Sequence, residues 1–405
     1  MYVTAGDMTR SLKLKNEDII DETDKIIRSW RQIVNQLGRT SESMDVKQIV
    51  EHIKEVERTG DTFKLDFIDY GRRLIERKSE GTARSYTPSL NCLERFTGGR
   101  PLDISKINVK FLENFEAFIR NEPVHTYSPK LGVVQTKKSK ENGRAVSSYL
   151  ANVRHIHNEA KKEFNDEDNG IIRIPQSPFK KYEVKKPPRS KKRAVSSITI
   201  QSIINLSDFK RSDGSIVDFT RRDLARDCFL LSFALAGMNA ADLYDCPAQN
   251  FGEGERVIVY KRKKTRTRRD DGAEMHIRIE PCIAQLVEKY KDPKGKKLFC
   301  FYRKYTTSNA FNVALRYGLL QVEKAIKSGE QFTFYSARHS YATISRSNAV
   351  NIDKYTIHED LNHVDAEMKV TDGYIERDYV NIWRANVKLL ALFDWSKLEL
   401  REMLR

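Results

Sequence analysis

The sequence predicts a mainly α-helical protein that carries one small antiparallel β-sheet in its C-terminal half. Apolar residues recur at helical spacing along most of the 405 residues, which is typical of helices that bury one face. Only two short segments are rich in β-branched residues, as strands are, and both lie between residues 256 and 281. A chain of this length also folds as two or three domains.

The N-terminal half is predicted to be helical throughout. Helices are expected within residues 16–38 and 44–60, while residues 1–12 look like the tail of a strand. A four-helix domain is expected over residues 61–182, with Asp61 opening its first helix and Gly98 and Gly99 ending its second. Its helices are predicted within residues 61–78, 82–99, 108–122 and 145–164, and the lysine-rich loop over residues 124–144 carries no strand signal.

A basic linker separates this domain from the second half. Residues 183–197 hold two prolines and six Lys or Arg residues, which predicts an extended, exposed segment, either a solvated tether or a strap along a DNA backbone. Beyond it we expect a buried helix at residues 220–237, strands at 256–264 and 273–281 joined by a turn at Asp271-Gly272, and helices at 281–291, 308–325, 336–347 and 379–393.

The net charge of +16 and the pI of about 9.4 favour a polyanionic partner, nucleic acid first and an anionic membrane second. No apolar stretch reaches membrane-spanning length, and the N-terminus lacks a signal pattern. The five cysteines are odd in number and widely spaced, which suggests neither a disulfide framework nor a zinc site. These features predict a cytoplasmic protein in a reducing compartment.

The densest positive cluster is "KRKKTRTRR" at residues 261–269, where seven of nine residues are Lys or Arg. If the strand continues, alternation places Tyr260, Arg262 and Lys264 on one side and Lys261 and Lys263 on the other. A hairpin tip with this charge suits a DNA groove and its phosphates. A solvated hairpin is the alternative, although seven cations without interleaved acids repel one another.

The segment "FTFYSARHSYAT" (332–343) places an arginine, a histidine and a serine side by side. A hydrolase dyad of His339 and Ser340 is disfavoured, because adjacent helical residues point about 100° apart and no G-x-S-x-G elbow is present. Arg338 near a helix start is the better candidate, since its guanidinium can hold two phosphate oxygens at once. A surface ion pair is the alternative.

A histidine and a tyrosine follow at close spacing. Tyr374 lies eleven residues after His363. A tyrosine hydroxyl, with a free pKa of about 10, becomes a competent nucleophile beside arginines that stabilise the phenolate. His358 and His363 are poorly spaced for metal ligands, and no acidic motif of a magnesium nuclease is present. Metal-independent phosphoryl transfer is the more economical interpretation.

The order of these motifs resembles the tyrosine recombinase (phage-type integrase) family. A basic hairpin lysine is followed by R-H-S, by "LNH" in place of L-G-H, and by a tyrosine about ten residues later. The wording "YSARHSYAT" and Y-x-R-x-K-T is most similar to integrases of conjugative and integrative mobile elements. The resemblance implies a helical core-binding (SAM-like) domain at 59–182, the basic linker at 183–197, a mixed α/β catalytic domain with a helical tail at 198–405, and a remnant of an arm-type DNA-binding domain at 1–58.

The resemblance also implies roles for single residues. Tyr374 matches the nucleophile that forms a 3′-phosphotyrosyl link, and Arg338 matches the second family arginine, which clamps the phosphate. Lys264 matches the lysine that protonates the leaving 5′ oxygen, and His363 matches the histidine that hydrogen-bonds the phosphate. His339 matches a supporting residue. No cofactor and no metal are implied.

Two positions depart from the family pattern. The first family arginine lies in G-x-R-x-x-E-L, but "GMNAADL" (237–243) has Asn239 there, a good helix N-cap without charge. A His or Lys usually stands three residues before Arg338, where this chain has the neutral Tyr335. We hypothesise that Arg262, two residues before Lys264, supplies the missing charge.

The resemblance implies double-stranded DNA as the partner and a homotetramer on synapsed DNA, formed from free monomers and aided by accessory DNA-bending proteins. The protein would integrate or excise a mobile element and associate with the nucleoid. A type IB topoisomerase-like enzyme and an inactive DNA-binding regulator stay open as alternatives. Expected DNA contacts are Arg84, Tyr86, Ser147, Ser148, Arg154, Lys186, Arg189, Lys191, Lys261 and Lys263. The apolar tail after Tyr374 packs either within the chain or on a neighbouring protomer.

Overall fold

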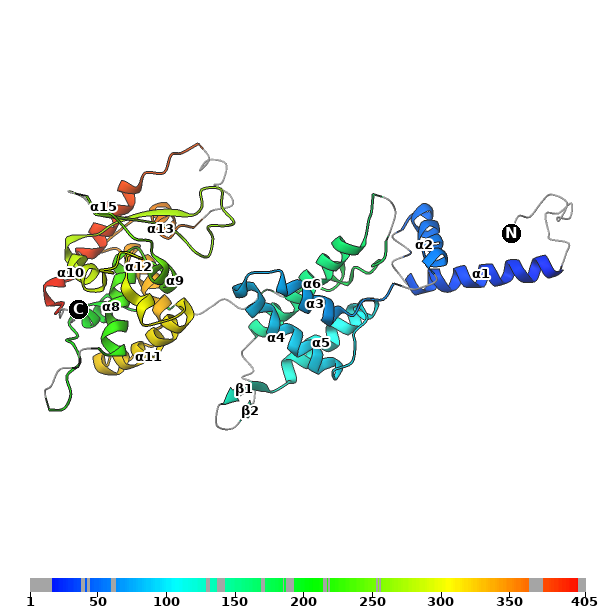
Figure 1. The fold of residues 1–405 in the computed structure, drawn as a ribbon, viewed down its shortest axis with the longest axis horizontal. Coiled ribbons are helices and arrows are strands. Elements are labelled where there is room, and N and C mark those ends of the chain that lie inside the picture. Colours follow the sequence, from blue (N-terminus) through cyan, green and yellow to red (C-terminus); the bar gives the residue numbers. More distant parts are fainter. Residues whose placement is uncertain are drawn as a thin grey trace. The chain divides into compact units, whose positions relative to one another are not determined.

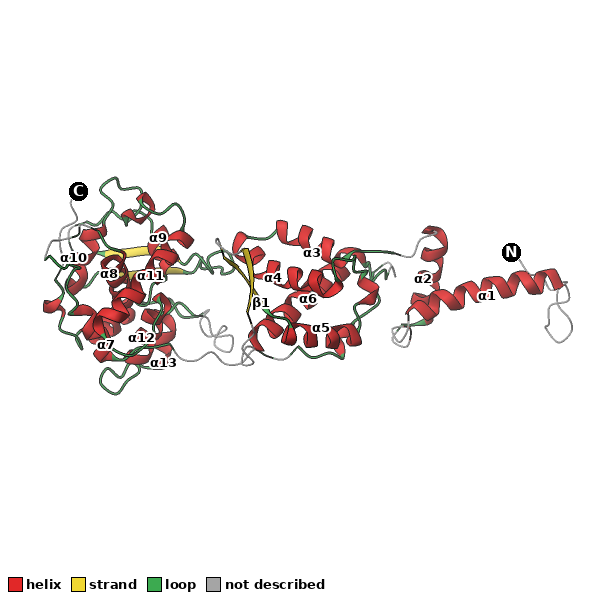
Figure 2. Ribbon diagram, turned by 90° about the horizontal axis from the view of Figure 1, so that it is seen from below, coloured by secondary structure: helices red, strands yellow, loops and turns green. Residues whose placement is uncertain are grey.

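The computed structural model describes residues 17–37, 41, 44–59, 63–128, 132–136, 143–168, 172–184, 186, 193–213, 217, 219–252, 254, 256–363 and 374–399. The chain divides into two units by its internal contacts, residues 1–190 and 191–405. Both units are mostly helical, and each has one two-stranded sheet (Figures 1 and 2). The mainly α fold class with a small antiparallel sheet in the C-terminal unit is therefore confirmed.

The first two helices pair along the chain. Helix α1 (Glu17–Leu37) and helix α2 (Val46–Thr59) bury Ile33, Leu37 and Ile53. Trp30 stays largely exposed and donates its indole N–H to Glu57 over 2.5 Å. The apolar face of α1 is thus only partly buried. The strand tail predicted for residues 1–12 lies outside the described residues.

Four helices build the core of the first unit: α3 (Phe67–Glu76), α4 (Glu80–Thr97), α5 (Val109–Asn121) and α6 (Gly143–Phe164). Asp66 caps α3 by accepting from the Ile68 and Asp69 N–H groups, so the predicted cap at Asp61, outside the described residues, was wrong. Gly98 ends α4 with a positive φ of 64°, as its sequence predicts. The buried side chains include Phe67, Leu90, Leu93, Phe115, Ile119, Leu150, Val153 and Ile156.

A short hairpin precedes α6 where the sequence predicts a loop. Strand β1 (Val124–Ser128) pairs antiparallel with β2 (Gly132–Thr136), and Val124 faces Thr136. The expectation that this segment carries no strand was therefore wrong. Its two strands are only five residues long, and their apolar and polar residues alternate too little to give a strand signal.

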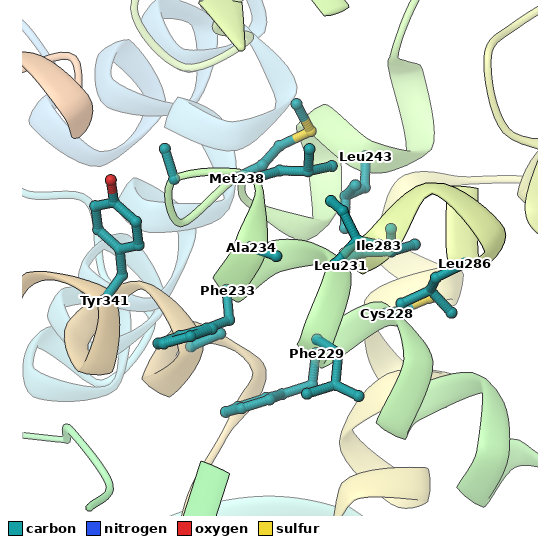
Figure 3. Packing of buried hydrophobic residues seen from close by; sticks show 14 of the residues in the cluster. Cys228, Phe229, Leu231, Phe233, Ala234, Met238, Leu243, Ile283, Leu286 and Tyr341 are labelled. Carbon is teal, nitrogen blue, oxygen red and sulfur yellow. The ribbon is translucent and has the colours of Figure 1, made fainter. Parts of the chain in front are cut away.

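The second unit surrounds one buried helix, α8 (Arg221–Ala234), in which every residue from Asp223 to Ala234 is buried. Figure 3 shows Phe233 of α8 beside Tyr341, and Phe229 and Leu231 of the same helix in the same buried cluster. Gly318 permits the closest helix approach, because a Cβ there would lie 2.0 Å from the Arg221 carbonyl oxygen. The other helices are α7 (Ser197–Ile204), α9 (Ala240–Asp245), α10 (Pro281–Tyr290), α11 (Ser308–Ile326), α12 (Phe334–Ser345), α13 (Lys354–Asp360) and α15 (Tyr379–Leu390).

Short 3₁₀ turns join several of these helices. They lie at Ile104–Lys106, Pro178–Lys180, Cys300–Arg303 and Trp395–Lys397.

The buried charges of α8 are paired: Arg226 donates to Asp208 over 2.6 Å and to Asp227 over 2.7 Å, and Asp227 accepts from Lys289 over 2.7 Å. Pairing of this kind is what allows charged side chains to lie inside a core.

The sheet of the second unit is shorter than the sequence suggests. Strand β3 (Val257–Lys261) pairs antiparallel with β4 (Glu274–Arg278), and Lys261 faces Glu274. A twelve-residue connection, 262–273, replaces the predicted two-residue turn, with Gly272 and Ala273 at positive φ near its end. Residues 263–268 curl as successive turns, so strand alternation stops at Arg262.

Among the described residues, no helix combines the length and apolar character needed to cross a membrane. The same residues hold no cluster of three or more His, Cys, Asp or Glu side chains suited to a metal ion.

His157 on α6 generates a prediction about acid stability. It is 1% exposed, lies edge-on to Phe179, and neither ring nitrogen has a hydrogen-bond partner among the described residues. Burial, and then the nearby Lys161, lower the pKa of His157 to about 4. The unfolded chain binds this proton from pH ~6.5 downward, so the first unit should lose stability as the pH falls from 6.5 through 4.

His157→Leu should remove that pH dependence. We expect hydrogen exchange of the α6 amides, corrected for intrinsic rates, to accelerate between pH 7 and pH 5 in the wild-type chain and to change less in the variant. Equal acceleration in both chains would contradict the assignment.

Candidate functional site

Arg338 lies in the first turns of α12, and its side chain turns inward. Ser336 accepts from the Thr333 N–H over 3.0 Å and fixes the helix start. The Arg338 guanidinium is 5% exposed and donates to the Gly237 carbonyl over 3.1 Å and to the Leu361 carbonyl. The alternative of a surface ion pair is therefore wrong. Ser340 is buried and accepts from the Val195 N–H over 2.8 Å, which is a structural role.

Gly237 makes room for this arginine. Its φ is +71°, and a Cβ at this position would lie 2.8 Å from Cγ of Arg338. Helix α8 ends at Ala234, three residues before the end predicted at Gly237. Asn239 occupies the N-cap position of α9, as predicted, but its side chain makes no capping hydrogen bond there.

Arg262 lies beside Arg338 at the same carbonyl. It follows β3 directly, is 7% exposed, and its Nη1 lies 3.5 Å from the Leu361 carbonyl oxygen. Its Nε is buried and has no hydrogen-bond partner within the described parts of the chain. The structure therefore brings the two guanidinium groups together at one acceptor, which spacing in the sequence could only suggest.

The positive charge of this pair shapes its surroundings. Burial lowers the pKa of Arg338 to about 10, with the charge of Arg262 as the second cause, so Arg338 stays protonated near neutral pH. Asp242 is buried close by and accepts from the Lys263 N–H over 2.8 Å. Burial raises the pKa of Asp242 even though Arg262 and Arg338 oppose that shift. One acid beside two buried cations leaves a site that favours an anionic ligand.

His363 lies at the edge of this arginine pair. Its Nε2 is 3.3 Å from Nη2 of Arg338, and its ring lies edge-on to His358 with centroids 5.1 Å apart. Burial, and then the charge of Arg338, lower the pKa of His363 to about 4. The imidazole is therefore neutral near neutral pH, and a bound anion would shift its pKa upward.

In the connection 262–273, Arg262 is buried at the site, while the lysine that follows it, Lys263, and Lys264 have exposed side chains. Lys264 is exposed, not aligned with the buried Arg262, so the expectation that strand alternation places both on one side was wrong. The chain turns after Arg262, since the Thr265 N–H donates to the Arg262 carbonyl over 3.1 Å. Lys263 pairs with Asp245 over 2.5 Å, and Lys261 lies 3.9 Å from Glu274. Both exposed lysines thus have acidic neighbours.

Tyr335 and His339 form the exposed rim of α12. Tyr335 is 43% exposed, and its ring lies edge-on to that of His339 with centroids 4.8 Å apart. Burial, then Arg193 and Arg338, lower the pKa of His339. Two aromatic rings with polar tips therefore border the arginine pair.

Tyr374 is 87% exposed, at the beginning of the last described segment. Tyr379 is different: its ring stacks on His276 with centroids 4.1 Å apart, and its hydroxyl donates to the Glu274 carbonyl over 3.3 Å. Burial raises the pKa of Tyr379, which disfavours its phenolate. Of the two tyrosines, Tyr374 is the one whose side chain is exposed to solvent.

The expected DNA contacts of the first unit lie mostly on exposed surface. Arg84 pairs with Glu80 over 2.5 Å, Ser148 and Arg154 are exposed, and Tyr86 packs edge-on against His155. Ser147 is buried, so we no longer expect it to contact DNA. In the basic linker, Lys186 is exposed, while Arg189 and Lys191 lie outside the described residues.

Several contributors escaped the sequence analysis. Gly237 and Asp242 belong to the quoted "GMNAADL" motif, but their contacts with Arg338 and Lys263 depend on how distant segments meet. The Leu361 carbonyl has no sequence signal, since every residue has one. Asn362 and Arg377 join this region through their side chains, and the asparagine in "LNH" was the available clue.

Comparison with known proteins identifies the domain and the fold. Residues 65–184 match the phage integrase SAM-like domain family. The Tn1549 transposon integrase, solved in complex with transposon right end DNA, superposes with a TM-score of 0.50 at 12% identity, covering 81% of this chain and 100% of that chain. A lambda integrase tetramer bound to a Holliday junction gives a TM-score of 0.49 at 14% identity, covering 78% of this chain and 80% of that one. No curated protein sequence matches.

The chain has the tyrosine recombinase fold. The resemblance drawn from its motifs is thereby confirmed. Within this recombinase fold, the arginine pair, His363 and the segment that begins at Tyr374 belong to the second unit, and the SAM-like domain belongs to the first.

Asp360 generates a prediction about alkaline stability. It is buried beneath the site, and its Oδ2 accepts from the Tyr341 hydroxyl over 2.8 Å. Burial raises the pKa of Asp360 to about 8. In the unfolded chain this carboxyl ionises near pH ~4, so folding takes up a proton between pH 4 and 8 and becomes less favourable as the pH rises.

Asp360→Asn keeps the acceptor for Tyr341 without the ionisation. We expect its thermal midpoint to exceed that of the wild-type chain by about 3 °C or more at pH 8, and by less at pH 5. Asp353→Asn is the matched control at the N-cap of the same helix. The Asp353 carboxylate accepts from the Thr356 N–H over 2.9 Å and from the Thr356 hydroxyl over 2.5 Å, and an amide has only one acceptor oxygen, so this substitution should destabilise. A wild-type advantage over Asp360→Asn that grows with pH would contradict this.

Proposed function

We propose that the protein is a site-specific DNA recombinase that cuts and rejoins DNA through a 3′-phosphotyrosyl intermediate. The observation that supports this most is the meeting of Arg338, Arg262 and His363 at one place in the recombinase fold. Two buried cations and a neutral imidazole suit a phosphodiester whose negative charge grows during reaction. Tyr374 lies eleven residues after His363 in the sequence.

The proposed reaction follows from the chemistry of these groups. The Tyr374 hydroxyl loses its proton to water and its oxygen attacks phosphorus, so that the new P–O bond forms while the bond from phosphorus to the 5′ oxygen breaks. Lys264 gives its proton to that leaving oxygen, which requires the exposed lysine to move onto the bound DNA. Arg338 and Arg262 hold the non-bridging oxygens, His363 donates a hydrogen bond to one of them, and Tyr335 borders the same phosphate.

Arg262 is proposed to supply the charge that Asn239 lacks. Its burial beside Arg338 and its shared acceptor at Leu361 support this assignment. One preorganised donor at a developing charge is worth about 3 kcal/mol or more, so a site with a single arginine would be slow. Helix α9 begins with the neutral Asn239, and the hairpin connection carries the second cation instead.

DNA binding is proposed to involve both units. Residues 59–182 would act as the core-binding domain and residues 198–405 as the catalytic domain, joined by the basic linker 183–197. The proposed contacts are Arg84, Tyr86, Ser148, Arg154, Lys186, Arg189, Lys191, Lys261 and Lys263. The lysines and arginines would attract phosphates by charge, and Tyr86 and Ser148 would donate hydrogen bonds to phosphate oxygens. Residues 1–58 would be a remnant of an arm-type domain.

The biological setting is proposed by analogy. The Tn1549 integrase structure holds transposon right end DNA, which suggests integration or excision of a mobile element here. Synapsis by a homotetramer, help from accessory DNA-bending proteins, and a cytoplasmic, nucleoid-associated location belong to the same proposal. An inactive regulator is less favoured, since the full set of proposed catalytic residues is present. A type IB topoisomerase would use the same chemistry and is less favoured because residues 65–184 match the SAM-like domain of phage integrases.

Tyr374→Phe tests the proposed nucleophile. A nicked suicide duplex that carries the recombination site should trap a covalent protein–DNA adduct with the wild-type chain and none with the variant, because a phenyl ring cannot bond to phosphorus. The adduct is measured by denaturing gel electrophoresis.

Tyr379→Phe is the matched control and should keep the adduct, since that ring is stacked on His276. An adduct that persists in Tyr374→Phe and disappears in Tyr379→Phe would reverse the assignment. Relaxation of supercoiled DNA that lacks any recombination site would favour the topoisomerase instead.

Arg262→Ala tests the proposed replacement of the missing arginine. We expect adduct formation to slow by roughly 10²–10³-fold, because a buried donor to the phosphate is lost. Arg262→Lys should recover part of the rate, since it returns the charge without the forked geometry. Single-turnover kinetics at saturating protein separate this effect from binding.

Arg266→Ala is the matched control for charge alone. Arg266 belongs to the same connection but is exposed. Its loss should weaken DNA binding slightly and leave the saturated rate near that of the wild-type chain. If Arg262→Ala cleaves at the wild-type rate while Arg338→Ala does not cleave, Arg262 does not replace the missing arginine.

A further inference from the structure

Asn362 stands at the centre of the "LNH" motif in an uncommon backbone conformation. Its φ is +50°, in the left-handed region, and its side chain is buried. Glycine adopts this conformation most easily, and asparagine tolerates it better than most residues. The backbone alone would be satisfied by glycine, so the buried carboxamide needs its own explanation.

The carboxamide holds both ends of the connection that carries Arg262 and Lys264. Its Nδ2 donates to the Ala273 carbonyl over 2.8 Å, and the same carbonyl accepts from the Arg262 N–H over 3.0 Å. Its Oδ1 accepts from Nη1 of Arg269 over 2.8 Å. The same Nη1 also donates to the Asn362 backbone carbonyl oxygen over 3.3 Å. Arg269 is fixed further by its ion pair with Asp271.

The same oxygen also reaches the segment that begins at Tyr374. Nη1 of Arg377 donates to Oδ1 of Asn362 over 3.3 Å and to the Glu274 carbonyl over 3.1 Å. Nη2 of Arg377 donates to the Glu359 carbonyl over 2.7 Å, and that carbonyl also accepts from the Asn362 N–H over 2.8 Å. Arg377 is the third residue after Tyr374, so their Cα atoms lie within about 11 Å of each other.

We propose that Asn362 is a positioning residue, whose carboxamide aligns the Lys264 connection and the Tyr374 segment with the adjacent His363 for cleavage. One side chain must donate to Ala273 and accept from two arginines, which an amide does and which neither glycine nor a carboxylate can do. This inference rests on the proposed recombinase function and adds a residue to its site.

The two halves of the carboxamide serve different parts of the reaction. The Nδ2 contact holds the connection from which Lys264 protonates the leaving 5′ oxygen. The Oδ1 contact with Arg377 holds the segment from which Tyr374 attacks. A substrate with sulfur in place of that 5′ oxygen releases a thiolate, which leaves without protonation because a thiol is far more acidic than an alcohol. Cleavage of the sulfur substrate therefore does not need the proton from Lys264, but it still needs the attack by Tyr374.

The experiment compares single-turnover cleavage of oxygen and sulfur suicide duplexes at saturating protein. Asn362→Asp keeps an acceptor for Arg377 and Arg269 and loses the donor to Ala273. It should slow the oxygen substrate by about 10²-fold, and the sulfur substrate should recover most of that loss. Arg377→Gln should slow both substrates alike. Asn362→Gly loses both contacts, and sulfur should recover only part of its rate.

Asn386→Ala is the matched control. Asn386 of α15 is also buried and donates to the Ala234 carbonyl over 2.9 Å, and among the described residues it makes no hydrogen bond to Ala273, Asn362 or Arg377. Asn386→Ala should lower the thermal midpoint. Any change in its cleavage rate should be the same for the oxygen and the sulfur substrate. Thermal midpoints and DNA affinities of all variants show that the compared chains are folded and bound.

Three results would overturn the proposal: oxygen cleavage by both Asn362 variants within about threefold of the wild-type rate, an equal loss on both substrates in Asn362→Asp, or sulfur rescue in Asn386→Ala. The proposed function is judged separately, because the wild-type adduct and its loss in Tyr374→Phe do not depend on Asn362. Failure of the wild-type chain to form any adduct would overturn both.

Discussion

The second unit depends on two buried guanidinium groups that share the Leu361 carbonyl as acceptor. Like charges in a weakly polar interior repel strongly, so they stay together only if the surroundings compensate. Asp242 supplies one negative charge, the carbonyls of Gly237 and Leu361 supply dipoles, and His363 stays neutral. The remaining positive charge is what the phosphodiester of the proposed reaction would neutralise.

This arrangement constrains residues that never touch a ligand. Gly237 must lack a Cβ because Arg338 passes against it, and Asp360 is buried one residue before the shared carbonyl. The short segment 360–363 therefore combines a neutralised acid, an acceptor for two arginines, a left-handed asparagine and a histidine. Substitutions here would alter several contacts at once, so their effects would not add.

Much of the fold could be predicted because it is local. Helical periodicity and glycine stops indicated α4, α5, α6, α8 and α11, since each depends on nearby residues. The β1–β2 hairpin was missed because its strands are only five residues long and carry little apolar alternation. Lys264 was misplaced because the alternation rule assumes that a strand continues, whereas the chain turns after Arg262. Contacts such as that of Asn362 with Arg377 join segments that are separate in the chain. Their only sign in the sequence is the asparagine that replaces glycine in the L-G-H motif.

The departure at Asn239 changes more than the origin of one charge. An arginine at the start of α9 would be held by the helix itself, next to Gly237 in the chain. Arg262 instead lies where β3 ends and a twelve-residue connection begins. If Arg262 carries the missing charge, the electrostatics of the site depend on how that connection is fixed. Asn362 binds the Ala273 carbonyl, which also accepts from the Arg262 N–H, so Asn362 would help to fix the cation that is proposed to replace the charge missing at Asn239.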